Sequence, residues 1–212
     1  MSHPDIRRAV PADVPEILRL VRELAAYEKE PDAVETTEED FVQALFPAKG
    51  EPTAHCHVAE AGEGKERRVV GLALWYLTFS TWTGKNGIHL EDLYVEPRHR
   101  GSGLGKELIA ELAAEYEPLE IVVGLPVNMQ GADTPSTVDA REFAAALQAR
   151  SGVPVRLVDE RLSTVSAHAA LRSSGRSQKN SRSIVDQVAA VVLLQQAIDT
   201  EKSTGNPAGA PV

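Results

Sequence analysis

The sequence predicts an α/β fold in which an antiparallel meander is followed by a β-α-β-α unit. Residues 55–95 alternate strand-like apolar runs with polar turns, which is the pattern of a meander. From residue 104 onward, helical spacing alternates with short apolar runs bounded by proline or glycine, as in a parallel sheet. The change of pattern indicates two parts within one chain of 212 residues.

The first part opens with a short strand and two helices. Residues 6–10 are strand-like, and Asp13 is the predicted N-cap of the first helix. Residues 36–39 (TTEE) supply a cap and early acidic residues for the second helix. Three strands are predicted next, over residues 55–59, 69–78 and 88–95.

The second part begins with a helix over residues 104–117, which Pro118 ends. Ile121–Leu125 is typical of a buried parallel strand. Ser136 or Thr137 caps the next predicted helix, which ends at Gly152. The remaining predicted elements are a strand over 153–158, a helix over 164–171, a basic loop over 172–182, a helix over 184–198 and a disordered tail over 201–212.

The composition restricts the setting of the protein. A single cysteine, Cys56, excludes a disulfide framework and a cysteine-based zinc site. The sequence has no run of about 18 apolar residues, so we expect no membrane association. The N-terminus, MSHPDIRRAV, lacks the apolar core of a signal peptide, which favours a reduced, cytoplasmic location.

The negative charge is concentrated in the first part. Residues 1–116 carry −8 of the net charge of −9, and residues 117–212 carry −1. An acidic part suits a small cationic partner and repels nucleic acid. The nearly neutral second part neither favours nor excludes nucleic acid.

The most specific chemical motif is Arg98–Lys106 (RHRGSGLGK), between a predicted strand and a predicted helix. Its alternating glycines allow a ligand to approach the backbone, and the helix N-terminus offers free N–H groups and partial positive charge. Arg98, Arg100 and Lys106 add formal positive charge. The loop suits a pyrophosphate, and a tight turn without a ligand is the alternative interpretation.

This loop resembles the Arg/Gln-x-x-Gly-x-Gly signature of GNAT-type N-acetyltransferases, which cradles the pyrophosphate of acetyl-CoA. The resemblance covers roughly residues 4–110 and is closest to the diamine, or spermidine/spermine, N-acetyltransferase branch. It is carried by LRLVRELAAYE (18–28), HCHVAE (55–60), VGLALWY (70–76), WTGK (82–85) and HLEDLYV (89–95). It implies that backbone groups of Leu93, Tyr94 and Val95 hold the cofactor arm. The implied pyrophosphate site consists of Arg100, Gly101, Ser102, Gly103, Leu104, Gly105 and Lys106.

The resemblance also implies that Glu91 and Asp92 lie beside a cationic amine acceptor. A carboxylate there can hold the cation and relay its proton through water. Neighbours in a strand point to opposite faces, so at most one of the two is expected to face the acceptor, and we favour Glu91. A structural cap or ion pair is the alternative for either. Tyr27 and Glu28 are further candidates to line the amine site. The alternative is that Tyr27 is an aromatic residue of the core and Glu28 is a solvated charge.

One expected acetyltransferase residue has no counterpart. The family continues with a strand and a helix that carries a tyrosine, the usual general acid for the departing thiolate. No tyrosine follows Tyr116 in this sequence. We therefore expect acetyl transfer to be impaired.

Residues 112–200 resemble a different family, YqgF/RuvX, whose members are called Holliday junction resolvases or pre-16S rRNA nucleases. Three motifs carry the resemblance in order: VVGLPVNMQG (122–131), VDERLST (158–164) and VDQVAA (185–190). The implied fold is RNase H-like, and its chemistry needs carboxylates that converge on Mg²⁺. Glu160 and Asp186 are the implied catalytic and metal-binding residues, and Asp159 points the other way.

The nuclease site is also incomplete in sequence. The family begins with a strand that carries an Asp-x-Gly ligand, and the meander occupies that place here. Asp186 alone could instead complement a helix dipole. Arg172, Arg176, Lys179 and Arg182 are the implied phosphate contacts under the nuclease interpretation, or a solvated basic loop.

The two resemblances meet inside one helix, near residues 107–116. We therefore interpret the chain as a chimera with an acetyltransferase-like half (1–111), a resolvase-like half (112–200) and a tail (201–212). Its strands form either one mixed sheet with helices on both faces or two half-cores. Acetyl-CoA binding with an acyltransferase activity is favoured over a Mg²⁺-dependent nuclease that acts on nucleic acid, and a chain with neither activity is the third possibility.

Overall fold

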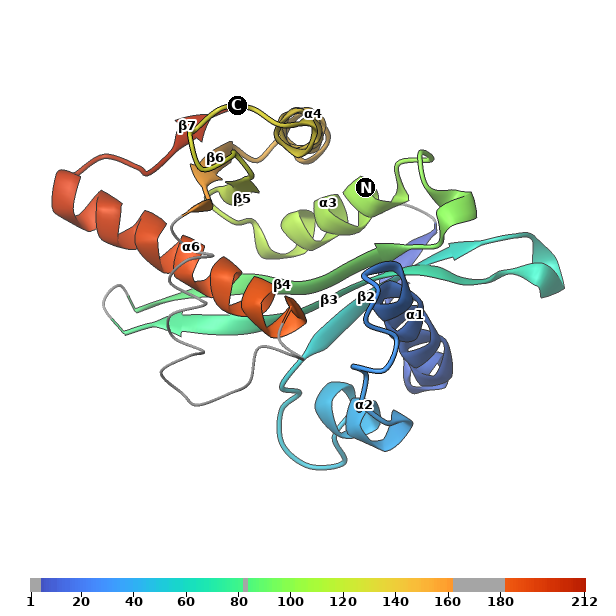
Figure 1. Ribbon diagram of the computed structural model, residues 1–212. Helices are drawn as coiled ribbons and strands as arrows, with labels where there is room; N and C mark the ends of the chain where they lie inside the picture. The colour runs from blue at the N-terminus through green and yellow to red at the C-terminus, as the bar shows by residue number, and fades with distance from the viewer. Residues whose placement is uncertain (1–4, 82–83, 162–181) are drawn as a thin grey trace. The chain divides into compact units, whose positions relative to one another are not determined.

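The computed structural model describes residues 5–81, 84–161 and 182–212, and the side chains of its last helix from residue 192 onward (Figure 1). The chain divides into two compact units, Met1–Glu115 and Tyr116–Val212. Each unit has its own sheet, so the strands do not form the single mixed sheet that was one of the two expected arrangements. Within the described residues, no helix is long and apolar enough to cross a membrane.

Unit 1 contains the predicted antiparallel meander. Its sheet has the order β1-β2-β3-β4, and every neighbouring pair is antiparallel. The strands are β1 (Ile6–Arg8), β2 (His55–Ala61), β3 (Arg68–Ser80) and β4 (Lys85–Val95). Short 3-10 helices cover Pro11–Asp13, Gly64–Glu66 and Pro97–His99. The predicted strands are confirmed; β2, β3 and β4 extend further into their turns than predicted, and β1 ends two residues earlier.

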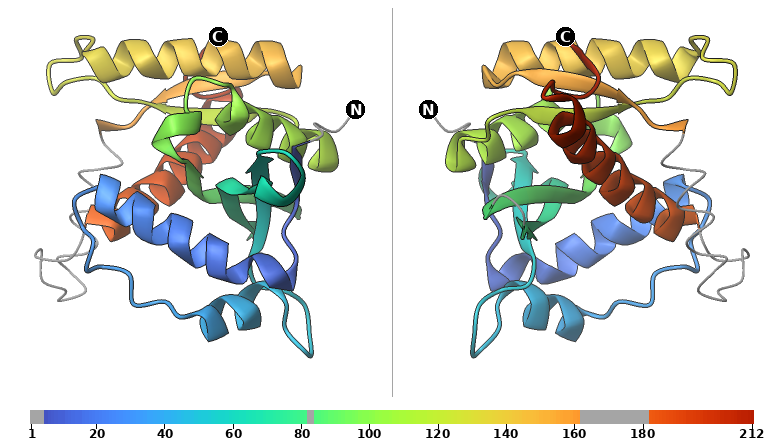
Figure 2. Two further views of the ribbon diagram at one scale, coloured as in Figure 1. Left: turned by 90° about the vertical axis from the view of Figure 1, so that its right-hand side faces the viewer. Right: turned by 90° about the vertical axis from the view of Figure 1, so that its left-hand side faces the viewer.

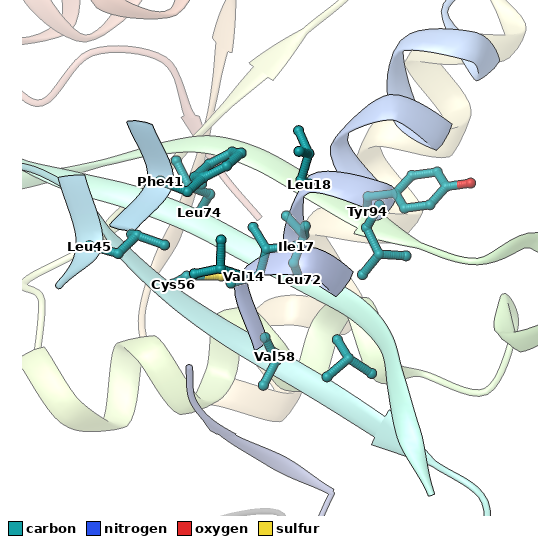
Figure 3. Close-up of a cluster of buried hydrophobic side chains, with 12 residues drawn as sticks. Val14, Ile17, Leu18, Phe41, Leu45, Cys56, Val58, Leu72, Leu74 and Tyr94 are labelled. Atoms are coloured by element: carbon teal, nitrogen blue, oxygen red, sulfur yellow. The ribbon is translucent and has the colours of Figure 1, made fainter. Parts of the chain in front are cut away.

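Helices cover both faces of this sheet (Figure 2). α1 (Val14–Tyr27) and α2 (Glu38–Leu45) lie on one face, and α3 (Leu104–Tyr116) lies on the other. Figure 3 shows side chains of α1 and α2 meeting those of the strands, with Ile17 and Leu72 fully buried between them. Each such apolar side chain contributes about 1.5–3 kcal/mol when it is removed from water.

The observed helix caps agree with the predicted ones only in part. The Thr37 hydroxyl accepts the N–H of Asp40 at 3.2 Å, as predicted for α2. Asp13 is the N-cap residue of α1, as predicted, but its side chain makes no capping hydrogen bond, because its carboxylate accepts the N–H of Val10 and binds Arg7. In unit 2, Thr134 rather than Ser136 or Thr137 is the N-cap, because Pro135 already occupies the first helical position.

Unit 2 is a three-stranded sheet with the order β5-β6-β7. β5 (Ile121–Leu125) and β6 (Val155–Asp159) are parallel, and α4 (Pro135–Ser151) connects them. α4 covers one face of this sheet, and α6 (Arg182–Thr204) covers the other, where Leu193 and Ala197 pack on Val158 (Figure 2). The predicted helix over 164–171 lies outside the described residues.

The tail is ordered, contrary to the prediction of disorder for residues 201–212. α6 continues to Thr204, and β7 (Ala210–Pro211) pairs antiparallel with β6. The N–H of Val212 donates to the carbonyl of Val155 at 3.1 Å. The prediction failed because it considered composition alone, whereas β6 has a second edge on which a short strand can complete its hydrogen bonds.

Candidate functional site

The glycine-rich loop of unit 1 is open where a ligand would approach. It runs from the 3-10 turn at Pro97–His99 to the start of α3 at Leu104. Gly101 and Gly103 have φ angles of 79° and 94°, which L side chains rarely adopt, and a Cβ at either position would meet no atom within 4 Å. The loop therefore presents bare backbone in front of a helix N-terminus, which is the geometry that suits a pyrophosphate.

Two of the three cationic side chains of the loop have partners inside the protein. Arg98 lies 2.9 Å from the buried carboxylate of Glu96, which also binds Arg68 at 2.6 Å. Arg100 donates from Nε to the carbonyl of Val95 at 2.9 Å. Lys106 lies in the first turn of α3, where its N–H donates to the carbonyl of Gly103. Arg98 and Arg100 are therefore engaged within the protein, so the backbone N–H groups are the main candidates for contacts between the loop and an anion.

β4 brings Leu93, Tyr94 and Val95 to the edge of the sheet. It is the last strand of the described four-stranded sheet, and β3 pairs with only one of its edges. The side chains of Leu93 and Val95 pack on the α3 face, and Tyr94 is buried on the face of α1 and α2. Backbone groups on the outer edge of β4, apart from the carbonyl of Val95 that accepts from Arg100, are thus the candidates to hold an extended ligand arm.

A β-bulge in β4 places both candidate carboxylates on one face. Asp92 lies opposite Leu74, whereas Leu90 lies opposite Trp75, so Glu91 is the additional residue. Leu74 packs under α1 and α2, and Leu90 packs toward α3. Asp92 therefore faces the α1 and α2 side.

Glu91 shares that side of the sheet. Its Oε2 lies 3.3 Å from Nε2 of His89, which precedes Leu90 and faces away from α3. The expectation that Glu91 and Asp92 point to opposite faces is therefore wrong, because the bulge interrupts the alternation of the strand.

The buried carboxyl group of Asp92 has a perturbed pKa. Burial raises the pKa of Asp92 to about 6, and the charges of Glu91 and Glu28 act in the same direction. A carboxyl group with such a pKa can exchange a proton near neutral pH. The sequence interpretation, which favoured Glu91, had no signal for the burial of Asp92, because burial depends on packing and not on residue type.

The second motif region, in unit 2, places Glu160 over a glycine. Glu160 directly follows β6, and its N–H donates to the carbonyl of Leu125 at 3.4 Å. A Cβ on Gly124 would lie only 2.5 Å from Oε2 of Glu160. The glycine within the VVGLP segment thus leaves the space that this carboxylate occupies. A glycine inside a short buried strand was the only sequence signal for this contact.

The neighbouring residues of this motif are held in place by an ion pair. Asp159 accepts from Nε of Arg161 at 2.9 Å, and Arg161 lowers the pKa of Asp159. Arg161 also reaches the carbonyl of Met129, in the turn that Asn128 stabilises by accepting two backbone N–H groups. The first two resolvase-like motifs therefore lie together at the ends of β5 and β6.

The third motif is described only in its backbone. Asp186 lies on α6, and its side chain is outside the described part of the chain. The same holds for the side chain of Arg182, and Arg172, Arg176 and Lys179 lie outside the described residues altogether. Among the side chains that the structure does describe, no three carboxylate, histidine or cysteine groups lie close enough to hold a metal ion. Of the implied pair of metal ligands, the described side chains therefore include Glu160 alone.

Comparison with known proteins matches both regions. The acetyltransferase (GNAT) family matches residues 17–129, and the family described as RuvX, Holliday junction resolvase, matches residues 95–200. The two matches share residues 95–129, which contain the glycine-rich loop, α3 and β5.

Relatives from each of the two families match this chain with more than 40% identity. A proposed pre-16S rRNA nuclease of Leifsonia xyli subsp. xyli is 54% identical over 112 residues, which cover 53% of this chain and 72% of the relative. The thialysine N-epsilon-acetyltransferase of Sus scrofa is 41% identical over 149 residues, which cover 66% of this chain and 86% of the relative. An aminoglycoside acetyltransferase from a soil metagenome aligns with a TM-score of 0.49 and 17% identity over 68% of this chain and 89% of its own. The chain therefore belongs to the acetyltransferase (GNAT) family over residues 17–129 and to the RuvX Holliday junction resolvase family over residues 95–200, and it is a fusion of the two.

Proposed function

We propose that unit 1 binds acetyl-CoA and transfers its acetyl group slowly to a small cationic amine. The observation that carries this proposal is the open glycine-rich loop at the N-terminus of α3, which directly follows the free edge of β4. The residues present fit the cofactor, because a side chain at Gly101 or Gly103 would fill the space in front of the helix. When bound, acetyl-CoA supplies an acetyl thioester that an amine can attack.

The protein's own groups have separate roles in this proposal. Backbone groups of the loop from Arg100 to Lys106 hold the pyrophosphate, and those of Leu93–Val95 hold the cofactor arm. Glu91 and Asp92, on one face of β4, hold the cationic acceptor. Asp92 is the proposed proton acceptor, because its raised pKa of about 6 lets it take up a proton near neutral pH.

The proposed acceptor is a primary amine on a short aliphatic chain. The pig relative is named for acetylation of an ε-nitrogen of thialysine, which supports this class. The charge of −8 on residues 1–116 favours a cation in the same way. We expect turnover to be slow, because no tyrosine follows Tyr116 to protonate the departing thiolate.

Calorimetric titration with acetyl-CoA tests the binding step. Gly103→Val should weaken binding at least about tenfold, because it obstructs hydrogen bonds to a charged ligand. Gly50→Val is the matched control, since Gly50 also has a positive φ (86°) and open surroundings but lies before β2. Equal affinity in the wild type and Gly103→Val would remove the loop from the site. Arg100→Ala should weaken binding less than Gly103→Val does, because backbone N–H groups make most of the contacts.

Acetylation of spermidine and of thialysine tests the chemical step. The wild type should turn over slowly, and Asp92→Asn should abolish the residual rate while acetyl-CoA still binds. A normal rate would show that another group replaces the missing tyrosine. A rate that is lost in Glu91→Gln and kept in Asp92→Asn would transfer the proton-accepting role to Glu91.

A metal-dependent nuclease is the second candidate function. The observation that favours it is the carboxylate of Glu160, for which Gly124 leaves space at the end of β6. The described residues do not supply a full set of metal ligands, so we derive no catalytic step from a metal ion. Catalysis is therefore proposed to be impaired in this half too, and the corresponding assay is given in the Discussion.

A further inference from the structure

Arg100 lies where three elements of unit 1 come together. The guanidinium carbon of Arg100 is 4.4 Å from the ring centroid of Tyr27 and 5.4 Å from that of Tyr94. Tyr27 is the last residue of α1, Tyr94 belongs to β4, and Arg100 begins the glycine-rich loop. Two aromatic rings within about 6 Å of a guanidinium make cation–π contacts.

The same side chain is fixed by a hydrogen bond to the strand. Its Nε–H donates to the carbonyl of Val95 at 2.9 Å, five residues earlier in the chain. The Tyr94 hydroxyl in turn lies 3.4 Å from a carboxylate oxygen of Glu23, another residue of α1. Arg100 thus ties the start of the loop to both β4 and the end of α1.

The rest of the loop has few side-chain contacts of its own. Gly101 and Gly103 have no side chains, and a Cβ at either position would have no atom within 4 Å. Ser102 donates its hydroxyl hydrogen to the carbonyl of His99, which is a contact within the turn. The conformation of the loop therefore depends on its two ends, which are Arg100 and the first turn of α3.

We propose that Arg100 is a positioning residue, which holds the glycine-rich loop ready by stacking on Tyr27 and Tyr94, and that Tyr27 thereby controls acetyl-CoA binding from α1. The effect on acetyl-CoA rests on the proposed function, whereas the effect on the loop does not. Under this proposal the planar shape and Nε of Arg100 matter, and its charge alone does not suffice. If Arg100 were a ligand of the pyrophosphate, its charge would be the essential property.

Lysine at position 100 separates these two roles. Lysine keeps the positive charge but has neither the flat guanidinium nor the Nε donor. A positioning role predicts that Arg100→Lys, which loses the Nε hydrogen bond and retains only part of the cation–π contact, lies closer to Arg100→Ala than to the wild type. A phosphate-binding role predicts that it behaves like the wild type.

Amide hydrogen exchange of residues 101–105 in the ligand-free full chain tests the effect on the loop. Loss of a cation–π contact at an exposed site should accelerate exchange about two- to fivefold. We expect this faster exchange in Arg100→Ala, Arg100→Lys and Tyr27→Ala. Tyr27→Phe keeps an aromatic ring, so its exchange should equal that of the wild type. Phe79→Ala is the control, because Phe79 and Tyr27 are both 64% exposed and Phe79 lies on β3. Unchanged exchange in Tyr27→Ala, or wild-type exchange in Arg100→Lys, would overturn the proposal.

Titration of the same variants with acetyl-CoA tests the effect on the ligand. Arg100→Lys and Tyr27→Ala should each weaken binding about two- to fivefold. The double variant Tyr27→Ala/Arg100→Ala should be no weaker than Arg100→Ala, because the two residues act through one contact. Additive losses would overturn the proposal. If the wild type binds no acetyl-CoA, the proposed function fails, and the exchange experiment still decides whether Arg100 and Tyr27 hold the loop.

Discussion

At the scale of single residues, the bulge at Glu91 places the two carboxylates of the proposed acceptor site on one face of the sheet. It turns Asp92 toward the face covered by α1 and α2, where burial and two nearby carboxylates disfavour its charge. A regular strand would have separated Glu91 from Asp92 and left one of them on the α3 face. The site therefore combines two carboxylates whose environments differ.

The raised pKa of Asp92 predicts that Asp92→Asn stabilises unit 1 at pH 7. The folded-state pKa of about 6 lies above the ordinary value, so the charged form costs stability once the pH exceeds both values. We expect a gain of about 1–3 kcal/mol at pH 7 that disappears near pH 4. Chemical unfolding followed by tryptophan fluorescence at both pH values checks this, since both tryptophans lie in residues 1–115. A loss of stability at pH 7 would show that the Asp92 carboxylate is paired.

In unit 2, Gly124 and Glu160 are predicted to be coupled. Gly124→Ala would place its Cβ 2.5 Å from the Glu160 carboxylate, so the side chain of Glu160 has to move. We expect a cost of about 1 kcal/mol in the wild type and a much smaller cost in a Glu160→Ala background. A double-mutant cycle of unfolding free energies measures the coupling. Equal costs in the two backgrounds would contradict the contact.

At the scale of secondary structure, α3 is the helix that both family matches share. Its Leu108 is fully buried against the sheet of unit 1. Near its end, Glu115 binds Arg8 and lies 3.2 Å from Nε2 of His57. Nδ1 of His57 accepts the indole N–H of Trp75, so Nε2 carries the proton that is donated to Glu115. These contacts fix the C-terminal end of α3 to the meander.

The group around Glu115 predicts that unit 1 loses stability in acid. Burial lowers the pKa of His57, and the hydrogen bond from Arg8 lowers that of Glu115. Groups with lowered pKa values bind protons more readily when unfolded, so stability is complete above about pH 7. It should fall as the pH drops below about 6.5 and again below about 4.5, the ordinary values of the two groups.

Glu115→Gln tests this assignment. It should cost about 1 kcal/mol at pH 7, because neutral hydrogen bonds replace charge-assisted ones. It should also reduce the loss of stability below about pH 4.5, since that carboxylate no longer titrates. Glu51→Gln, at an exposed position before β2, is the control. Identical pH profiles for the wild type and Glu115→Gln, measured by urea unfolding, would remove Glu115 from this role.

At the scale of the whole molecule, each of the two families is represented by part of its characteristic residues. The acetyltransferase part keeps the cofactor loop and both acidic residues but is not followed by the expected tyrosine. The resolvase part keeps Glu160 and Asp186 but is not preceded by the expected Asp-x-Gly strand. In the proposed function, binding of acetyl-CoA depends on the loop and β4 alone, so we expect it to be the activity most compatible with the fusion.

We predict that the full chain does not cleave nucleic acid. Two-metal cleavage needs carboxylates from several elements to hold ions about 3.5–4 Å apart, and this chain supplies Glu160 and Asp186 from the expected set. The charge of −8 on residues 1–116 also opposes the approach of nucleic acid. The measurement is cleavage of four-way-junction DNA and precursor rRNA with Mg²⁺ or Mn²⁺. Metal-dependent cleavage that is lost in both Glu160→Gln and Asp186→Asn would contradict the prediction.

The order of elements and both family memberships were predictable from sequence, because strand alternation, helical spacing and contiguous motifs are local features. The glycine-rich loop, the strand before it and the DERLST segment could be recognised for the same reason. The capping hydrogen bond of Asp13 and the cap at Ser136 or Thr137 were predicted less well, since a neighbouring arginine binds the Asp13 carboxylate and a neighbouring proline decides which residue caps α4.

Only the tertiary structure decided which side chains meet. The position of the bulge depends on the pairing of β4 with β3, and the stacking of Arg100 depends on where α1 ends. Gly124 lies beside the carboxylate of Glu160 because of the register in which β5 pairs with β6. β7 forms because it pairs with the second edge of β6. The sequence by itself determined the families and the local motifs of this protein. Contacts between residues distant in the chain determined which side chains are buried, which face of the sheet they occupy and how their pKa values shift. These properties exist only once the strands and helices have packed.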